Sequence, residues 1–143
     1  MAPFGVCKVG LEELLERSDF ISLHPPLTEE TFHMLSAREF ARMKDGVVVV
    51  NTSRGPVIDE AALVEALASG KVWAAGLDVM EQEPLPADSP LRRFPNVTLT
   101  PHTGASAVES CDALYRIGCE IVIEACAGRW PPRVVNPEVS GPR

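Results

Sequence analysis

Residues 47–67 read VVVVNTSRGPVIDEAALVEAL and carry the clearest structural signal in the chain. The unbroken run of β-branched residues at 47–50 is typical of a strand buried on both faces. Asp59 is a favoured helix N-cap residue, and the apolar spacing after it predicts a helix that ends at Gly70. A doubly buried strand followed directly by a helix indicates an α/β protein built on a parallel sheet.

On both sides of this stretch, strand-like and helix-like segments alternate. Further helices are expected at residues 11–17, 36–43 and 106–127, and further strands at residues 19–23, 72–79 and 97–100. Ser36 and Glu39 have the spacing of a capping box, which marks the start of a helix. The last helix is apolar on nearly all sides, so we expect it to be buried on most of them. The alternation predicts a parallel sheet with helices on both faces.

The composition is that of one ordinary globular domain. The chain has 143 residues, of which 45% are hydrophobic and 23% are charged. Its net charge is −7 and it has no basic cluster, which argues against a nucleic-acid partner. No apolar run approaches the ~20 residues of a membrane span, and the N-terminal residues do not resemble a secretory signal, so no membrane partner is expected. The four cysteines form no C-x-x-C pair, which favours a reduced, cytoplasmic protein without a metal site.

Ligands of parallel sheets bind at the carboxyl ends of the strands. The loops of interest are therefore residues 24–31, 52–56, 78–84 and 101–105. Arg54 could bind a carboxylate through its guanidinium fork, or be an ordinary surface arginine. His102 could transfer a proton near neutral pH with Glu83 orienting it, or the two could be a structural histidine and a solvated carboxylate. Asp78 could accept a hydrogen bond from a ligand amide, or bond within its own turn.

Four segments, taken together and in this order, resemble the NAD-dependent D-2-hydroxyacid dehydrogenase family. They are LEELLERSDFISLHPPLTEET, VVVVNTSRGPVIDEAALVEAL, AAGLDVMEQEP and NVTLTPHTGAS, and the resemblance extends over residues 5–139. The family includes D-3-phosphoglycerate dehydrogenases, glyoxylate/hydroxypyruvate reductases and the C-terminal-binding corepressors. The resemblance implies an oxidoreductase that interconverts D-2-hydroxy acids and 2-oxo acids with NAD(H).

The resemblance also assigns roles residue by residue. By position, Arg54 matches the family's substrate-binding arginine, His102 its proton donor, and Glu83 the glutamate that pairs with that histidine and favours its protonated form. Asp78 matches the aspartate that contacts the nicotinamide carboxamide. The remaining cofactor-binding positions are matched by Pro25, Pro26, Thr31, Thr52, Ser53, Gly104 and Ala105. NAD is the expected cofactor, with NADP left open, and the substrate is a small 2-oxo or 2-hydroxy acid.

Two other histidines lie close to these positions. His24 is expected to be structural or to support the residues that contact the ligand, and His33 is expected to be a surface residue. Neither is assigned a role by the resemblance.

The chain departs from the family pattern near its start. It has neither the G-x-G-x-x-G turn that holds the pyrophosphate nor an evident acidic residue for the adenine ribose. We therefore expect a partial Rossmann-type parallel sheet with flanking helices, lacking the first βαβ glycine-rich unit. Residues 1–128 are expected to form the C-terminal part of the NAD-binding domain, and residues 129–143 a tail that would return to an absent substrate domain.

This departure leaves alternatives open. The chain could be a fragment of an active enzyme, a non-catalytic truncated product, or an association module like the corepressors. In each case an open sheet edge and an apolar last helix favour a homodimer, or association with a complementing chain.

Overall fold

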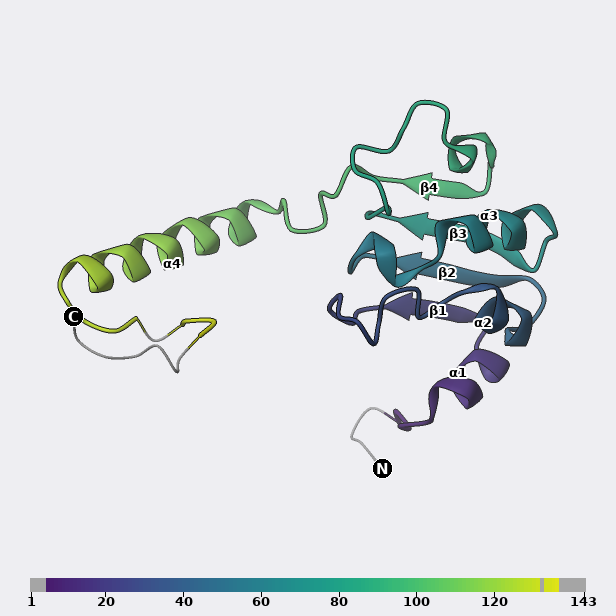
Figure 1. Ribbon diagram of the computed structural model, residues 1–143, viewed down its shortest axis with the longest axis horizontal. Helices are drawn as coiled ribbons and strands as arrows, with labels where there is room; N and C mark the ends of the chain where they lie inside the picture. The colour runs from purple at the N-terminus through teal and green to yellow at the C-terminus, as the bar shows by residue number, and fades with distance from the viewer. Residues whose placement is uncertain (1–4, 132, 137–143) are drawn as a thin grey trace. The chain divides into compact units, whose positions relative to one another are not determined.

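The computed structural model describes residues 5–131 and 133–136 (Figure 1). The chain divides into two units, residues 1–103 and residues 104–143. The first unit holds a sheet and its helices, and the second unit holds one long helix. The predicted alternation of strands and helices is confirmed over residues 11–77 of the first unit.

The sheet of the first unit has four parallel strands in the order β1-β2-β3-β4 (Figure 1). The strands are β1 (Phe20–Leu23), β2 (Val47–Asn51), β3 (Val72–Leu77) and β4 (Val97–Leu99). Each strand pairs in parallel with the next one along the chain, so all four end at the same edge of the sheet. The predicted α/β class is therefore confirmed, as a partial Rossmann-type sheet with flanking helices.

The valine run of β2 lies in the interior of the sheet. Val47 and Val49 are fully buried, and Val48 and Val50 are half-buried on the opposite face. The strand has a parallel neighbour on each side, so its backbone groups are paired along both edges. Together these contacts explain why only β-branched residues precede Asn51, the first polar residue of the strand.

Three helices flank the sheet: α1 (Leu11–Arg17), α2 (Ala37–Arg42) and α3 (Glu60–Ala68). Helix α1 precedes β1, α2 connects β1 to β2, and α3 connects β2 to β3. The connection from β3 to β4 contains no α-helix, only a 3₁₀ turn at Pro90–Arg93. Helix and strand residues share one hydrophobic cluster, in which Leu15, Phe40, Leu63, Val49 and Leu77 are buried. This core holds the strands rigid and leaves the loops beyond them free to carry polar groups.

The helices begin at the predicted residues. The Glu39 carboxylate accepts the backbone N–H of Ser36 at 3.1 Å, and the Asp59 carboxylate accepts the N–H of Ala62 at 3.1 Å. Each bond satisfies a backbone donor that the first turn of a helix leaves without a partner. Gly70 follows α3 with a φ of +79°, the left-handed conformation that ends many helices.

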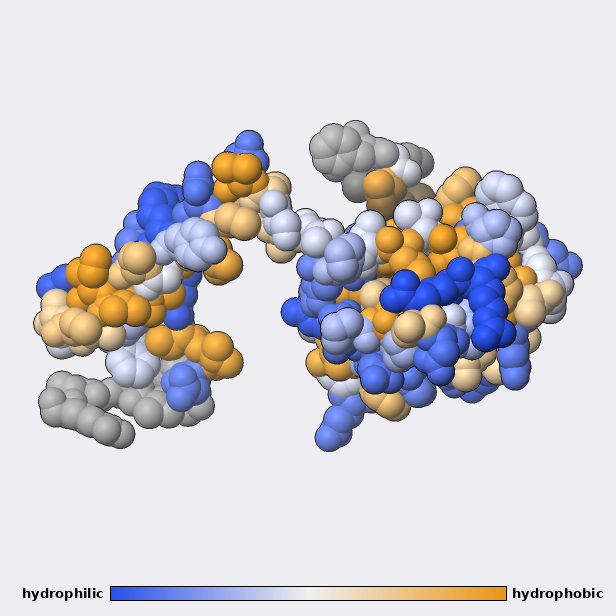
Figure 2. Space-filling view, turned by 90° about the horizontal axis from the view of Figure 1, so that it is seen from above, coloured by the Kyte–Doolittle hydropathy of each residue, from blue (hydrophilic) through white to orange (hydrophobic). Residues whose placement is uncertain are grey.

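The second unit contains helix α4 (Val108–Cys126). The prediction of a helix here is confirmed, but the prediction that it is buried is wrong, because none of its residues is buried. Leu114 and Tyr115 are 69% and 70% exposed, and Figure 2 shows hydrophobic residues on the surface of this unit. An apolar helix is covered only where a second element packs on it, and the described part of this unit contains no other helix or strand.

Three further findings concern membrane-spanning helices, metal ligands and cysteines. Within residues 5–131 and 133–136, no helix combines the length and apolarity needed to cross a bilayer. The same residues contain no group of three or more His, Cys, Asp or Glu side chains placed to hold a metal ion. All four cysteines are free thiols, and three of them, Cys111, Cys119 and Cys126, lie on α4.

Candidate active site

The candidate site residues follow the carboxyl ends of the strands. Arg54 lies three residues beyond the end of β2, Asp78 directly follows β3, and His102 lies three residues beyond the end of β4. Because the strands are parallel, these residues lie along one edge of the sheet, where ligands of such folds bind. Sequence spacing alone places them at this edge, and the structure adds which of them touch.

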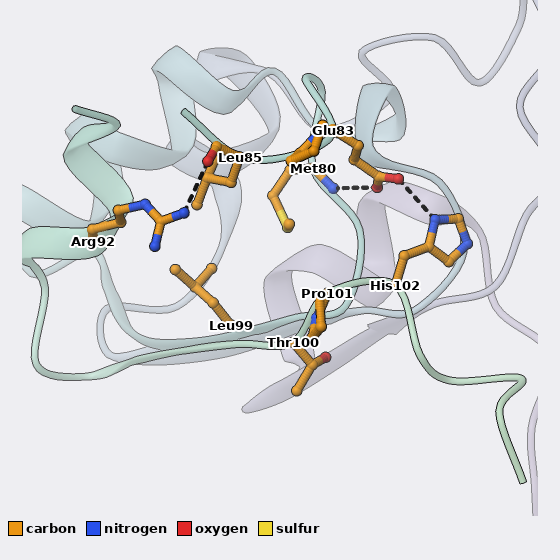
Figure 3. A pocket seen from close by; sticks show the side chains of 9 residues that line it. Met80, Glu83, Leu85, Arg92, Leu99, Thr100, Pro101 and His102 are labelled. Atoms are coloured by element: carbon orange, nitrogen blue, oxygen red, sulfur yellow. Dashed lines mark hydrogen bonds and ion pairs between the residues drawn. The ribbon is translucent and has the colours of Figure 1, made fainter. Parts of the chain in front are cut away.

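His102 and Glu83 are in direct contact. The Nδ1 atom of His102 lies 2.8 Å from Oε2 of Glu83, and Oε1 of Glu83 accepts the backbone N–H of Met80 at 3.0 Å (Figure 3). A carboxylate acceptor requires the proton on Nδ1, so Nε2 is the ring nitrogen left to face a ligand. The hydrogen bond with His102 is the main reason that the pKa of Glu83 lies below its usual value. The bond from Met80 adds to this effect, and partial burial opposes it.

The backbone of His102 is also fixed. Its φ of +55° lies in the left-handed region, which is uncommon for a residue with a side chain. Its N–H donates to the backbone carbonyl of Asp78 at 2.9 Å. The Asp78 carboxylate accepts the N–H of Thr103 at 2.9 Å and the hydroxyl of Thr100. Asp78, which is buried, therefore joins the end of β3 to the turn that carries the histidine.

A cavity of about 500 Å³ lies beside the His102–Glu83 pair (Figure 3). Its walls are largely apolar, and its lining residues are Met80, Glu83, Pro84, Leu85, Arg92, Leu99, Thr100, Pro101 and His102. Arg92 donates to the backbone carbonyls of Leu85 and Pro86 at 2.8 and 2.9 Å. These bonds join the start of the long connection after Glu83 to the 3₁₀ turn near its end.

The Arg54 turn is organised by Asn51, which sequence reasoning did not select. Asn51 is 1% exposed, and its side-chain amide donates to the carbonyl of Arg54 at 2.9 Å. Its side-chain oxygen accepts both the N–H and the hydroxyl of Ser53, at 3.0 and 2.9 Å. The available signal was a single amide side chain that ends a strand made otherwise of valine. Because the turn is bonded to a buried residue, the position of Arg54 is fixed relative to β2.

Gly55 brings this turn against the loop that carries Glu83. A Cβ atom on Gly55 would lie 1.9 Å from the carbonyl oxygen of Met80. No side chain fits at that distance, so only glycine permits the two loops to approach so closely.

Arg54 faces a second hollow of about 440 Å³, lined by His24, Pro25, Pro26, Leu27, Ser53 and Arg54. The structure thus brings together three of the predicted cofactor positions, namely Pro25, Pro26 and Ser53. The hydroxyl of Thr31 donates to the carbonyl of Pro26 at 2.7 Å and so supports the wall of this hollow. Thr52 is exposed and does not line it.

The remaining predicted positions are distributed differently. Gly104 and Ala105 belong to the second unit. His102 and Glu83 line the first cavity, which shares no residue with the hollow that contains Arg54. His24 bonds the Ser22 hydroxyl through Nε2 at 2.9 Å and also lines the hollow beside Arg54. The structure therefore brings the histidine and the glutamate together, and places the arginine separately on the neighbouring loop.

A parallel sheet with polar side chains at its carboxyl edge defines the class of the protein: an α/β domain of the Rossmann type, which binds ligands at that edge. The sequence profile of the family described as D-isomer specific 2-hydroxyacid dehydrogenase, NAD binding domain, matches residues 1–104. The chain belongs to this family, which confirms the resemblance seen in the sequence.

Curated relatives carry reductase names. A glyoxylate reductase of Korarchaeum cryptofilum is 49% identical over 135 residues, which cover 94% of this chain and 41% of the relative. The glyoxylate/hydroxypyruvate reductase B of Citrobacter koseri is 47% identical over 138 residues, which cover 96% of this chain and 43% of the relative. The chain therefore spans less than half the length of these relatives.

Solved structures share the fold. The TT0316 protein of Thermus thermophilus has a TM-score of 0.88 and 40% identity, covering 94% of this chain and 43% of that protein. A D-lactate dehydrogenase of Lactobacillus jensenii solved with NAD⁺ has a TM-score of 0.82 and 33% identity, covering 89% and 42% of the two chains. A D-isomer specific 2-hydroxyacid dehydrogenase of Xanthobacter autotrophicus Py2 solved with NADPH and MES has a TM-score of 0.76 and 38% identity, covering 90% and 52%.

Proposed function

We propose that this chain carries the catalytic residues of an NAD(H)-dependent oxidoreductase that interconverts a small D-2-hydroxy acid and the corresponding 2-oxo acid. The observation that carries the proposal is the 2.8 Å contact between His102 and Glu83 at the carboxyl edge of a parallel sheet. Relatives named as glyoxylate and hydroxypyruvate reductases make these two acids the first substrates to test.

Arg54 is the proposed binding residue for the substrate's carboxylate. A guanidinium group presents parallel donors that match both oxygens of a carboxylate, and its positive charge polarises a neighbouring carbonyl. Asn51 and Ser53 hold the backbone of the turn, which fixes where the arginine side chain begins. The result is a substrate oriented before any bond changes.

His102 is the proposed proton donor. During reduction its Nε2–H passes to the carbonyl oxygen, while the Nδ1–H remains bonded to the Glu83 carboxylate. Glu83 thereby stabilises the imidazolium and fixes the ring so that Nε2 faces the substrate. In the direction of oxidation, the neutral Nε2 accepts the hydroxyl proton.

The nicotinamide of bound NAD(H) supplies or accepts the hydride. The hollow beside Arg54 fits such a ligand, because it opens at the carboxyl ends of β1 and β2 and has about 440 Å³ of space. We assign contacts with the cofactor to Pro25, Pro26, Thr31, Thr52, Ser53, Asp78, Gly104 and Ala105. NADP is retained as an alternative, because solved relatives contain either dinucleotide.

With this function we also propose the domain boundaries and the location of the protein in the cell. Residues 1–128 form the C-terminal part of the NAD-binding domain, and residues 129–143 the tail toward a substrate domain. Residues 137–143 lie outside the described residues. We place the protein in the cytoplasm, where its four free thiols stay reduced.

A second candidate function is association without catalysis. The exposed apolar residues of α4, among them Leu114, Tyr115 and Val122, favour it, because a stable protein seldom leaves such a face uncovered. The partner is a second copy of this chain or a chain that complements it, as in a corepressor-like module.

The test joins this chain to the N-terminal half of the Citrobacter koseri reductase and measures NADH oxidation with glyoxylate and hydroxypyruvate. We expect turnover, and we expect His102→Ala to lower kcat by about 10²–10⁴-fold with little change in NADH affinity, since proton transfer takes place in the transition state. Lys44→Ala, which removes an exposed ion pair with Asp19, is the matched control. Equal turnover of the His102→Ala and Lys44→Ala chimeras would refute the assignment.

The chain alone is tested by calorimetric titration with NADH. Its sequence contains no G-x-G-x-x-G turn, and that turn supplies the N–H donors for the pyrophosphate. We expect a dissociation constant weaker than about 1 μM, the value that corresponds to roughly 8 kcal/mol. Tighter binding would show that the remaining loops hold the cofactor without this turn.

A further inference from the structure

His33 is part of a cluster that the assignments above do not use. The sequence predicts a surface residue here, and the side chain is one-third exposed. Its Nε2 lies 2.9 Å from Oε1 of Glu81, and its ring stacks on Phe32 with the centroids 4.0 Å apart. No local pattern marks this contact, since 48 positions separate His33 from Glu81.

The Glu81 carboxylate is shared with the start of α3. The same Oε1 accepts the backbone N–H of Glu60 at 2.9 Å, and Oε2 of Glu60 accepts the N–H of Glu81 at 3.3 Å. Burial raises the pKa of Glu60. The hydrogen bond from Glu81 opposes the rise, and the negative charge of Glu81 adds to it. His33 therefore contributes a donor at the point where two carboxylates would otherwise repel each other.

The cluster connects the loops that carry the proposed site. The backbone N–H of His33 donates to the carbonyl of Pro56 at 2.8 Å, two residues beyond Arg54. Glu81 lies two residues before Glu83 in the loop after β3. The ion pair thus joins the loop after β1 to the loop after β3, and both are bonded to the segment after β2.

Close contacts between these loops prevent any one of them from moving without the others. Gly55 lies against the carbonyl of Met80, where even a Cβ atom has no room. Met80 in turn donates to Glu83, which holds His102. A shift of Glu81 is therefore transmitted through its neighbour Met80 to the Arg54 turn on one side and to the His102–Glu83 pair on the other.

We propose that His33 and Glu81 are positioning residues for the dehydrogenase reaction, an inference that rests on the proposed function. Neither residue lines the cavity beside His102 or the hollow beside Arg54. The contact between them holds the loop of Glu83 and the turn of Arg54 in a fixed relative position, so that the proton donor and the carboxylate-binding arginine meet the same substrate. An ordinary surface ion pair would have no such effect on distant side chains.

The first test uses the 143-residue chain and needs no activity. The chain has three histidines, so each imidazole signal in a proton–carbon NMR spectrum is assigned by one substitution. We expect His33→Ala to shift the His102 signal, and His33→Gln, whose amide can donate to Glu81, to restore it. Lys44→Ala removes an ion pair of the same 2.9 Å length at Asp19 and should leave the signal unchanged. A His102 signal that is identical in His33→Ala and the parent overturns the proposal.

The second test measures kinetics in the chimera with the Citrobacter koseri N-terminal half. His33→Ala should lower kcat about tenfold with the KM for NADH unchanged, since a misplacement of about 1 Å can cost 10²-fold. His33→Gln should recover most of the loss. Equal kcat values for His33→Ala and Lys44→Ala would contradict a positioning role.

Two further comparisons show whether a loss of activity comes from the His33–Glu81 contact or from a defect in folding. Glu81→Met removes the acceptor at similar volume, together with the bond from the Glu60 N–H, and should lose at least as much as His33→Ala. The double variant should lose no more than Glu81→Met alone, because His33 acts through Glu81. If the parent chimera is inactive, the proposed function fails, and the NMR comparison alone still decides whether His33 controls the environment of His102.

Discussion

Replacing Glu83 by glutamine removes the negative charge of the side chain and keeps its size. Glutamine carries no negative charge, and its single amide oxygen can accept from His102 or from Met80 but not from both, because these two bonds use different oxygens of Glu83. Reduction requires the protonated imidazole, so its rate declines as rising pH removes that proton. Without the carboxylate, no negative charge at this position stabilises the protonated ring. The decline in kcat/KM for the Glu83→Gln chimera should therefore begin at a lower pH than in the parent.

The size of this change in kcat/KM follows from the geometry of the His102–Glu83 pair. The nitrogen–oxygen distance is 2.8 Å, but the His102 and Glu83 side chains are 48% and 34% exposed, so solvent screens their attraction. An ion pair at this exposure contributes at most about 1 kcal/mol. Since about 1.4 kcal/mol corresponds to a factor of ten, we expect kcat/KM of the Glu83→Gln chimera at alkaline pH to be up to about fivefold lower than that of the parent.

The assay is kcat/KM for glyoxylate in the chimera between about pH 5 and pH 9, the range that spans histidine titration. Asp19→Asn is the matched control, because it removes a carboxylate from an ion pair of 2.9 Å with Lys44 outside the proposed site. Superimposable profiles of the parent and Glu83→Gln would mean that the two groups are not coupled. The assignment of the His102–Glu83 pair would then have to be withdrawn.

Three other predictions concern binding, stability and assembly. Arg54→Lys should raise the KM for glyoxylate and lower kcat in steady-state assays, because an ammonium group cannot donate to both carboxylate oxygens, and unchanged constants would exclude the clamp. Gly55→Ala should lower the free energy of unfolding by about 1–3 kcal/mol in urea titrations, whereas Gly118→Ala, with open space around its Cβ, should be neutral or stabilising. The chain should self-associate through α4, and sedimentation of a clean monomer at high concentration, or no change on Leu114→Lys, would contradict this.

Local signals in the sequence predicted most of the first unit. The capping residues Ser36 and Asp59 mark the starts of two helices, and the valine run at 47–50 marks an inner strand; both kinds of signal depend on neighbours within four or five positions. The strand at 72–79 ends at Leu77, two residues early, because Asp78 turns to bond the His102 loop.

The sequence by itself determined the fold class, the family and the edge of the sheet where the site residues lie. The resemblance also anticipated that Glu83 and His102 meet, and the structure contains that contact, while their chemical roles stay predictions. Tertiary structure alone decided the part played by Asn51, the close approach of Gly55 to Met80, and the cluster around His33. The physical reason is that strand and helix propensities act between near neighbours, whereas the loops meet only after parallel strands bring distant segments to one edge.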